Sequence, residues 1–579
     1  MLRAIPTVFA AFLVLMIAAC GNNSNNPPNN PSVTVSPATA NVQEGSQQQF
    51  TATVSGTNDN SITWQVNGVT GGNATAGTIS ATGLYTAPSV IPNPASVTIT
   101  AFLTNMSTVS GSAIVTITAV TFNNSSLKGN YVFGLSGLDV NANPFYAIGA
   151  ITADGSGNIT GGEEDIVDTS SGYVSATSIK GTYSVGADGR GTLTFSNSIG
   201  QFQFAIALKA AGGAVMNEVD NGVVAASGTF EAQGTTLGVP SGNYAFGFSG
   251  SGLGCGPVNS AGIFNMNGGA IGGVQDVNCG GTIVKSQAVN GSYGAIDTLG
   301  RGTGSFSGSS TGSSNMIYYV VSAGRFRFLA DPNNPSFFLG SADLQTQPSF
   351  AATDFNGSYI ITSSANTNAG VSYTLIEINA SGGNVSSGYF DVNDTGVQGS
   401  AALSGSYSLS SNGYVTGTWN VSNASLPFAM YLFSPTQGYY LDERTNAVGG
   451  GNLYAQSGSV TTNAAWAGSF ATKQFGYFLV NGLLNNNNAS SVSGQISADG
   501  NGTLAGTLDI NDPAGVATGQ TLQGGYSVGT VAPGRMTLTI TTSFEGTRSY
   551  VGYIVDQQRV LLLETDNNLV SGGDALRQF

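Results

Sequence analysis

The sequence predicts an all-β protein, with an N-terminal β-sandwich followed by four tandem copies of an eight-stranded antiparallel meander. Three observations predict this fold class. Apolar and polar residues alternate with a period of two through most of the chain, which is typical of half-buried strands. No segment shows a convincing helical period. From residue 124 onward, glycine and aromatic marks recur in steps of 113, 115 and 111 residues, which is long enough for each copy to be a domain.

The composition is that of a folded chain that does not bind nucleic acid. Of 579 residues, 41% are hydrophobic and 83 are glycine, so the chain can bury cores and has many positions for turns. The net charge of −15 argues against binding to phosphate backbones. The absence of histidine removes His-dependent triads and His-ligated metals. We expect no catalysis, because similar acids recur in every copy, whereas a hydrolase needs one cleft with one carboxylate pair.

Residues 1–20 have the features of a lipoprotein signal peptide. Arg3 precedes an apolar run over 4–19, which is shorter than the ~20 residues of a membrane span. The run ends in Ile-Ala-Ala before Cys20, which resembles the lipobox of bacterial lipoproteins. The resemblance implies that Cys20 is lipidated and anchors the chain to a membrane of the cell envelope. The alternative is an ordinary signal peptide that contains a cysteine.

Residues 21–31 predict a tether, because they are rich in Asn and Pro and have no apolar side chain to bury. Gly21, rather than an aspartate, follows the cysteine, which favours the outer membrane over the inner one. We expect the folded domains to be periplasmic or extracellular.

Residues 32–119 alternate as about seven short strands, which predicts a sandwich. The run VSPATANVQEGSQQQFTATV, followed by Trp64 and by GTISATGLYTAP at 77–88, resembles the bacterial group 2 immunoglobulin-like domains. The resemblance implies a spacer domain. Phe50 belongs to the same pattern, and we expect Trp64 and Tyr85 to be core residues without a ligand role.

The four copies occupy 124–233, 238–347, 351–456 and 464–579. Each has a Gly-[Asn/Ser]-[Tyr/Phe] motif near its start and a Gly-x-Tyr motif later. The aromatic residues of these motifs are Tyr131, Tyr244, Tyr359 and Phe470, and then Tyr183, Tyr293, Tyr407 and Tyr526. Asp-Gly, Asn-Gly and Ser-Gly pairs recur between strands and predict tight hairpins.

The first copy divides into eight strands within about 110 residues. In 202–209, apolar residues alternate with polar or small ones, so one face of this strand is buried. Such a meander can close into an up-and-down barrel, which leaves no strand edge, or split into two packed sheets. We prefer the barrel, whose strand count loosely resembles the avidin and lipocalin barrels.

Cys255 and Cys279 lie in two loops that an up-and-down meander places at the same end of the second copy. We predict a disulfide between them, as is usual in an exported protein. The alternative is two free thiols.

Acidic residues gather in what we expect to be loops at one end of the copies. Oxygen-bearing side chains at alternating spacing could hold calcium as a cofactor. They are Asp391, Asn393, Asp394, Asp509, Asn511 and Asp512. The spacing is not that of an EF-hand, and the second copy lacks half of the set. We therefore prefer solvated loop carboxylates that cap turns.

Adjacent aromatic pairs recur in the second and third copies: Tyr318-Tyr319, Phe337-Phe338 and Tyr439-Tyr440. Neighbours in a strand point to opposite faces, so one ring fills the core. The other can stack on a sugar or pack against the next copy, and we prefer packing between copies.

These features predict a lipid-anchored envelope protein with a structural or adhesive role, in which the four copies extend as a rod. Its partners would be the membrane, through the lipid, and a glycan or cell-surface protein. The alternative is a protein that binds a glycan or small ligand at the long-loop ends of the barrels. An apolar cavity inside each barrel would favour that alternative.

Overall fold

The structure is a computed structural model that describes residues 30–139, 141–168, 172–210, 212–220, 225–252, 254–308, 312–330, 337–458, 460–480 and 483–579. Cys20, the predicted signal peptide and most of the predicted tether lie outside these ranges. The chain divides into two compact units, one made by most of the chain up to Ile117 and the other by Thr118–Phe579. No helix in the described ranges is long and apolar enough to cross a membrane.

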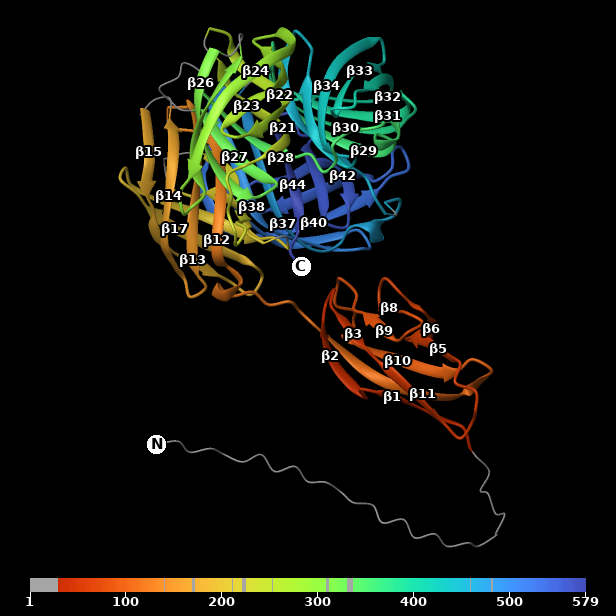
Figure 1. Cartoon of the computed structure of the whole chain (residues 1–579). Helices are drawn as coiled ribbons and strands as arrows, with labels where there is room; N and C mark the ends of the chain where they lie inside the picture. The colour runs from red at the N-terminus through yellow and green to blue at the C-terminus, as the bar shows by residue number, and fades with distance from the viewer. Residues whose placement is uncertain are drawn as a thin grey trace, which may run out of the picture. The chain divides into compact units, whose positions relative to one another are not determined.

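The smaller unit consists of β-strands (Figure 1). They are β1 (Ser32–Ser36), β2 (Thr39–Gln43), β3 (Gln47–Gln49), β4 (Thr51–Ser55), β5 (Ile62–Val66), β6 (Val69–Thr70), β7 (Gly72–Asn73), β8 (Gly77–Ile79), β9 (Leu84–Thr86), β10 (Ser96–Leu103) and β11 (Met106–Thr118). One sheet has the order β2-β11-β10-β5-β6, a second has the order β3-β9-β8-β7, and β1 pairs with β4.

Trp64 and Tyr85 are buried, as predicted, and so is Phe50. Phe50 and Tyr85 are fully enclosed and Trp64 is 6% exposed. The rings of Phe50 and Tyr85 meet edge to face with centroids 6.4 Å apart. Gly83 has a φ of 84°, and a Cβ there would lie 2.4 Å from the carbonyl oxygen of Phe50, so this turn requires glycine. The run that resembles immunoglobulin-like domains thus forms core and turn together.

The larger unit contains four barrels, numbered 1 to 4 in chain order. Barrel 1 consists of β12 (Lys128–Leu138), β13 (Pro144–Asp154), β14 (Asn158–Asp168), β15 (Gly172–Ser178), β16 (Lys180–Val185), β17 (Arg190–Ser196), β18 (Gln201–Leu208), β19 (Ala214–Glu218) and β20 (Ala225–Ala232). Barrel 2 consists of β21 (Gly242–Gly252), β22 (Gly256–Asn267), β23 (Ala270–Cys279), β24 (Thr282–Ile296), β25 (Arg301–Gly308), β26 (Gly312–Ser322), β27 (Arg325–Ala330) and β28 (Phe337–Leu344).

Barrel 3 consists of β29 (Gly357–Thr367), β30 (Gly370–Ser381), β31 (Asn384–Asp394), β32 (Val397–Leu409), β33 (Tyr414–Val421), β34 (Ala424–Ser434), β35 (Gln437–Asp442) and β36 (Ala447–Ala455). Barrel 4 consists of β37 (Ala467–Val480), β38 (Leu483–Asp499), β39 (Thr503–Asp512), β40 (Gly515–Val528), β41 (Arg535–Thr542), β42 (Gly546–Asp556), β43 (Arg559–Glu564) and β44 (Leu569–Arg577). The strands of every barrel fall within the ranges predicted for the copies.

Each barrel closes because its first strand pairs with its last, both antiparallel. The other pairs join strands that are neighbours in the sequence, except that β14 of barrel 1 pairs with both β15 and β16, so the order is up-and-down. In barrel 1, β15 and β16 together take the place that one long strand takes in the other three. The predicted all-β fold and the preference for barrels over sandwiches are confirmed.

The barrel interiors are packed with their own side chains. In barrel 2, the Phe246 ring lies 4.9 Å from that of Phe264 and 5.4 Å from that of Phe306. In barrel 3, Trp419 stacks on Phe428 at 3.7 Å. These are continuous apolar cores. The alternative function, ligand binding at the long-loop ends of the barrels, therefore lacks the apolar cavity in each barrel that would favour it.

The first repeated motif marks a backbone position that only glycine adopts easily. Its glycines are Gly129, Gly242, Gly357 and Gly468, and their φ angles lie between 120° and 124°. An L side chain is strained in this region, so the motif is explained by backbone conformation.

The tyrosine of the second motif holds the segment that enters each barrel. Tyr183 donates its hydroxyl to the carbonyl of Leu127 at 2.7 Å, and Tyr526 donates to Trp466 at 2.6 Å. Both acceptors directly follow a single 3₁₀ turn, η1 (Asn124–Ser126) or η3 (Asn463–Ala465). The motif is therefore structural, since it satisfies the carbonyls left unpaired by this turn.

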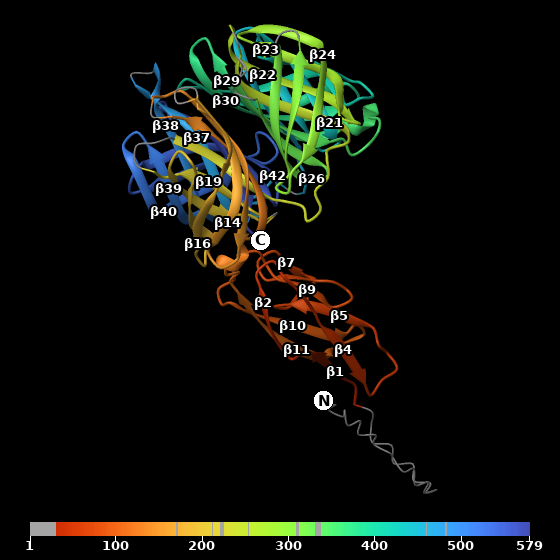
Figure 2. The same cartoon turned by 60° about the vertical axis from the view of Figure 1, so that its left-hand side comes forward.

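The four barrels form a closed ring, and the prediction of an extended rod is wrong. β13 lies against β26 and β27, β22 against β34 to β36, and β30 against β43 and β44. β18 to β20 of barrel 1 then lie against β38 of barrel 4, and both views show barrel 1 (orange) beside barrel 4 (blue) (Figures 1 and 2). Because each barrel uses the same two faces for its neighbours, the contacts turn in one direction and close after four copies.

Candidate functional site

A buried aspartate lies at each of the four seams, which we define as the contacts between barrels 1 and 2, 2 and 3, 3 and 4, and 4 and 1. These residues occupy the same position in the third strand and are at most 2% exposed: Asp165, Asp276, Asp391 and Asp509. In three seams, an arginine at the start of the fifth strand of the next barrel donates to the aspartate. The pairs, each at 2.7 Å, are Arg301 with Asp165, Arg535 with Asp391, and Arg190 with Asp509.

The seam between barrels 2 and 3 differs, because Tyr414 stands where the other barrels have the arginine. Burial and the nearby Asp276 raise the pKa of Tyr414 and of its cross-strand neighbour Tyr431. A positive charge is supplied elsewhere in this seam, where Lys285 pairs with Glu443 at 2.6 Å.

A tyrosine opposite the seam arginine adds a second donor in two seams. Tyr319 is the ladder partner of Arg301 and donates its hydroxyl to Asp165 at 2.8 Å. Tyr553 does the same beside Arg535 and donates to Asp391 at 2.6 Å. The equivalent residue in barrel 1 is Ala207, so the seam between barrels 4 and 1 lacks this hydroxyl.

The asparagine two residues after the aspartate binds the backbone of the next barrel. Asn278 donates to the carbonyl of Ala447 at 2.7 Å, Asn393 to that of Leu569 at 2.9 Å, and Asn511 to that of Glu218 at 2.9 Å. Barrel 1 has Val167 here, which packs with apolar residues of barrel 2. The Asp-x-Asn pattern is therefore a seam motif.

A glutamine after the last strand of each barrel also reaches the next barrel. Gln233 donates to the carbonyl of Val320 at 2.7 Å, Gln345 to that of Leu432 at 3.0 Å, and Gln456 to that of Ile554 at 2.7 Å. Gln578, the penultimate residue, donates to the carbonyl of Asp188 in barrel 1 at 3.1 Å. Barrel 4 thus makes the same glutamine contact with barrel 1 that each other barrel makes with the barrel after it, although no chain segment joins barrels 4 and 1 directly.

The residues considered as calcium ligands do not converge on one point. Asp391 and Asp509 face arginines, and Asn393 and Asn511 face carbonyls, as described above. Asp394 accepts a hydrogen bond from Thr367 at 3.0 Å, and Asp512 accepts one from the backbone of Ala514 at 2.8 Å. Among the described residues, no three His, Cys, Asp or Glu side chains group so that they could hold a metal ion.

The expectation that these acids are solvated loop carboxylates is wrong for Asp391 and Asp509. They are 1% and 2% exposed and lie in β31 and β39. The arginines that compensate their charge are 144 and 319 residues away in the chain, so no local pattern predicted the burial.

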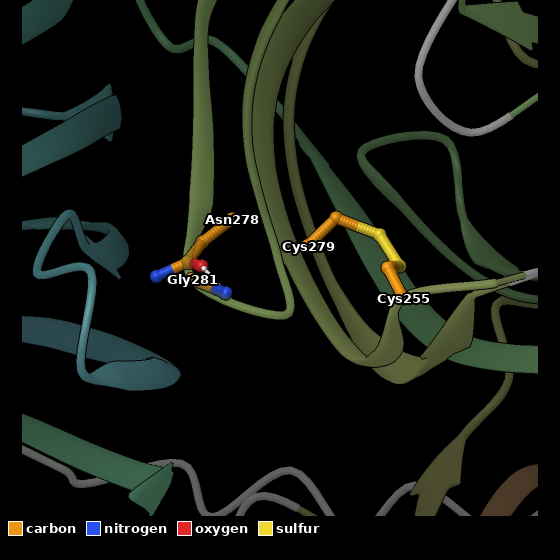
Figure 3. The surroundings of a disulfide bond; sticks show 4 residues. All are labelled: Cys255, Asn278, Cys279 and Gly281. Carbon is orange, nitrogen blue, oxygen red and sulfur yellow. Dashed lines mark hydrogen bonds between the residues drawn. A yellow bond between two sulfur atoms is a disulfide. The ribbon is translucent and has the colours of Figure 1, made fainter. Parts of the chain in front are cut away.

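The predicted disulfide is present, since Cys255 and Cys279 are bonded and their Cα atoms are 5.5 Å apart. Figure 3 shows Cys279 pointing toward Cys255 and the preceding Asn278 pointing to the other side of the strand. Gly281 donates its backbone N–H to Asn278 at 3.1 Å. The disulfide thus braces the hairpin whose asparagine binds barrel 3.

The interpretation of the aromatic pairs as core and inter-copy contacts is confirmed. Tyr318 lies in the core of barrel 2, and Tyr319 lies in the apolar cluster between barrels 1 and 2. Tyr440 lies in the core of barrel 3, and Tyr439 lies in the cluster between barrels 2 and 3. Phe338 and Phe337 divide in the same way between the barrel 2 core and the first seam.

A cavity of about 550 Å³ lies at the centre of the ring, where all four barrels meet. Most of its walls come from the first, seventh and eighth strands, with residues of β30 and β34 of barrel 3 added, and each barrel contributes, for example Thr229, Ser341, Tyr454 and Phe475. A second cavity of about 400 Å³ shares Tyr454 with it, and a third of about 410 Å³ shares Phe475. The space at the centre of the ring therefore continues in two directions.

The central cavity contains an ion-pair cluster. Arg327 pairs with Glu231 at 2.6 Å, and Arg325 pairs with Asp343 at 2.8 Å. Arg325 Nε also lies 2.9 Å from Glu231, but this buried N–H lacks hydrogen-bond geometry. Although burial would raise it, Arg327, Arg325 and Lys209 lower the pKa of Glu231 to about 2. Glu231 is therefore ionised at neutral pH.

This cavity could not be predicted from the sequence, because its residues come from all four copies and differ from one copy to the next. Arg325 and Arg559 occupy the first position of the seventh strand, where the third copy has Gln437. The predicted rod has no central space, so nothing in the sequence indicated that these residues would line a cavity. The recurring aspartate of the third strand and arginine of the fifth strand were the marks that could have indicated the seams.

No family model matches this chain, and no curated protein matches it. Among solved structures, it resembles a mutant of transferrin binding protein B from Haemophilus parasuis at 11% identity and a TM-score of 0.17, over 63% of this chain and 82% of that one. It also resembles isotype 1 transferrin binding protein B from serogroup B Neisseria meningitidis at 10% identity and a TM-score of 0.18, over 64% of this chain and 84% of that one. At these scores, neither likeness carries information about function.

Proposed function

We propose that this chain is a lipid-anchored protein of the bacterial cell envelope with a structural or adhesive role, in which the four barrels act as one preassembled head. The observation that carries the proposal is the contact of barrel 4 with barrel 1, through Arg190 and Gln578, which fixes all four barrels in one body. The lipobox before Cys20 supports the anchor, and the predicted tether and immunoglobulin-like domain support display away from the membrane.

The anchor is tested by labelling cells with a radioactive fatty acid. We expect the wild-type chain to take up label and fractionate with membranes, and Cys20→Ala to do neither. An unlabelled, freely released wild-type chain would overturn the anchor. Shaving of intact cells with protease then reports whether the head faces the outside.

The adhesive role is tested by binding of the purified full chain to whole cells and to a glycan array. We expect binding that is lost when the ring is opened by Asp509→Asn, because a preassembled head presents surfaces from several barrels at once. Equal binding by both chains would show that ring closure is not needed for adhesion. Absence of binding by the wild-type chain to any surface would leave the structural role as the function of the head.

A further inference from the structure

We infer that the central cavity binds a small oxyanionic ligand, one that carries phosphate or carboxylate groups together with hydroxyls. Lys209 and Arg559 would hold its charge. The inference rests on the cavity alone and is independent of the lipid anchor.

The first observation is the charge balance of the cavity wall. Five cationic side chains face it, namely Lys209, Arg325, Arg327, Lys473 and Arg559, against three carboxylates, Glu231, Asp343 and Asp574. The wall thus has an excess of two positive charges in a chain whose net charge is −15. One third of all Lys and Arg residues of the protein meet here. Surplus positive charge that lines a cavity favours an anion.

The second observation identifies the surplus. Glu231 and Asp343 pair closely with Arg327 and Arg325, whereas Asp574 lies 3.8 Å from Lys473 and its Oδ1 has no hydrogen-bond partner among the described residues. Among the described residues, no carboxylate lies within 4.0 Å of the side-chain nitrogens of Lys209 or Arg559. Lys209 and Arg559 are therefore the two cations of the cavity wall that form no direct ion pair, and Glu231 acts on Lys209 only at longer range.

Lys209 and Arg559 are also near each other in the wall. Both line the central cavity and the second cavity, so they stand where the two spaces join. Lys209 follows β18 of barrel 1, and Arg559 begins β43 of barrel 4. The pair therefore forms only when the ring closes.

The surroundings of Lys209 and Arg559 favour contact with an anion. Burial lowers the pKa of Lys209 to about 8, so it remains largely protonated at pH 7 but has lost part of its solvation. The guanidinium carbon of Arg559 lies 4.2 Å from the centroid of the Tyr454 ring, so this cation stacks on an aromatic ring of the cavity wall.

The remaining wall matches a hydroxylated ligand of modest size. The hydroxyls of Thr229, Ser341 and Tyr439 lie in the wall, where they are bonded to Arg327, to each other and to Asp343, and Phe475 supplies an apolar face. A volume of about 550 Å³ is within the range of small-molecule sites. An acidic or phosphorylated sugar has this combination of charge, hydroxyl groups and size.

The test is calorimetric titration of the purified full chain at pH 7 and low salt with pyrophosphate, with citrate and with uncharged glucose. We expect pyrophosphate or citrate to bind and glucose not to bind. A response to pyrophosphate alone would identify phosphate as the recognised group, and a response to citrate alone would identify carboxylate. Absence of binding by both anions, or equal binding of glucose, would overturn the inference.

Two variants locate the site. Arg559→Gln introduces the residue that the third copy has at this position, and Lys209→Met keeps the length of the stem. Each should weaken anion binding at least tenfold, whereas Lys180→Met, which removes an exposed lysine of barrel 1, should change it less than twofold. If Lys209→Met fails to fold, Lys209→Arg must retain binding. Unchanged affinity in Arg559→Gln would place the anion elsewhere and overturn the assignment.

Discussion

The seam between barrels 3 and 4 and the seam between barrels 4 and 1 solve the same contact with different chemistry. Between barrels 3 and 4, an apolar cluster of eight buried residues surrounds the ion pair of Asp391 and Arg535. Between barrels 4 and 1, the apolar cluster has only three buried residues, Ala207, Val215 and Ala471. The second seam instead uses hydrogen bonds, including one from Asn217 to the carbonyl of Asp509 at 2.9 Å.

The difference follows from connectivity. Barrels 3 and 4 are joined by the chain, so their contact forms at high effective concentration and can rely on apolar burial, which has little directional preference. Barrels 4 and 1 are the ends of the ring and meet without a direct link. A polar seam tolerates exposure to water before closure, and its hydrogen bonds define one register for the two barrels.

The largest expected effect is the loss of one carboxylate at the apolar seam. Asp391→Asn should lower the free energy of unfolding by about 3 kcal/mol, because it leaves the buried charge of Arg535 unbalanced and only one acceptor oxygen for Arg535 and Tyr553. Asp509→Asn should cost about 2 kcal/mol, since its seam has no tyrosine and Arg190 is 19% exposed at the side chain. Urea denaturation followed by fluorescence of the buried Trp419 and Trp466 measures both values. A larger loss in Asp509→Asn would contradict the ranking of the two seams.

The next effect concerns Glu377, which is 3% exposed beside the apolar seam. Burial raises its pKa to about 7, whereas barrel 4 has Gln495 at the equivalent position. The folded state therefore binds more protons than the unfolded state between pH 4.5 and 7. Stability from this group is present at low pH and is lost as the pH rises through 7.

Glu377→Gln should consequently stabilise the protein by about 2 kcal/mol at pH 8 and leave it unchanged at pH 4.5. Thermal unfolding at the two pH values measures the difference. Glu164→Gln is the control, because Glu164 also has a pKa raised to about 7 by burial but accepts a hydrogen bond from Asn197 in barrel 1. An equal gain at both pH values for Glu377→Gln would contradict the assigned pKa.

The smallest expected loss of stability comes from removing one glutamine contact between barrels. This loss is compared for two barrels that the chain joins and for barrels 4 and 1, which it does not join directly. Gln345→Ala and Gln578→Ala each remove hydrogen bonds to a neighbouring barrel, at about 1 kcal/mol each. Only Gln578→Ala acts where no chain joins the barrels, so it alone should increase the radius of gyration in X-ray scattering and speed limited proteolysis. Identical scattering by the two variants would show that the ring stays closed without its terminal contact.

Local pattern predicted the strands, the four copies, the disulfide and the division of Tyr318-Tyr319 and Tyr439-Tyr440 between two faces. These features depend on neighbours in a strand or on loops at one end of a meander. The burial of Asp165 could not be predicted in this way, because its partner Arg301 is 136 residues away. The central cavity was even harder to predict, because it exists only when the ring closes and its charged residues differ from one copy to the next.

The four head-to-tail seams arrange the copies as the subunits of a cyclic homotetramer are arranged, but within a single polypeptide. In an assembly of identical subunits, any change at the axis would appear four times, and four arginines at one level would repel each other. Fusion of the copies removes that constraint, so Arg325, Gln437 and Arg559 can occupy one ring of positions together. The centre of the molecule is therefore free to be asymmetric, while the seams keep the symmetry that holds it closed.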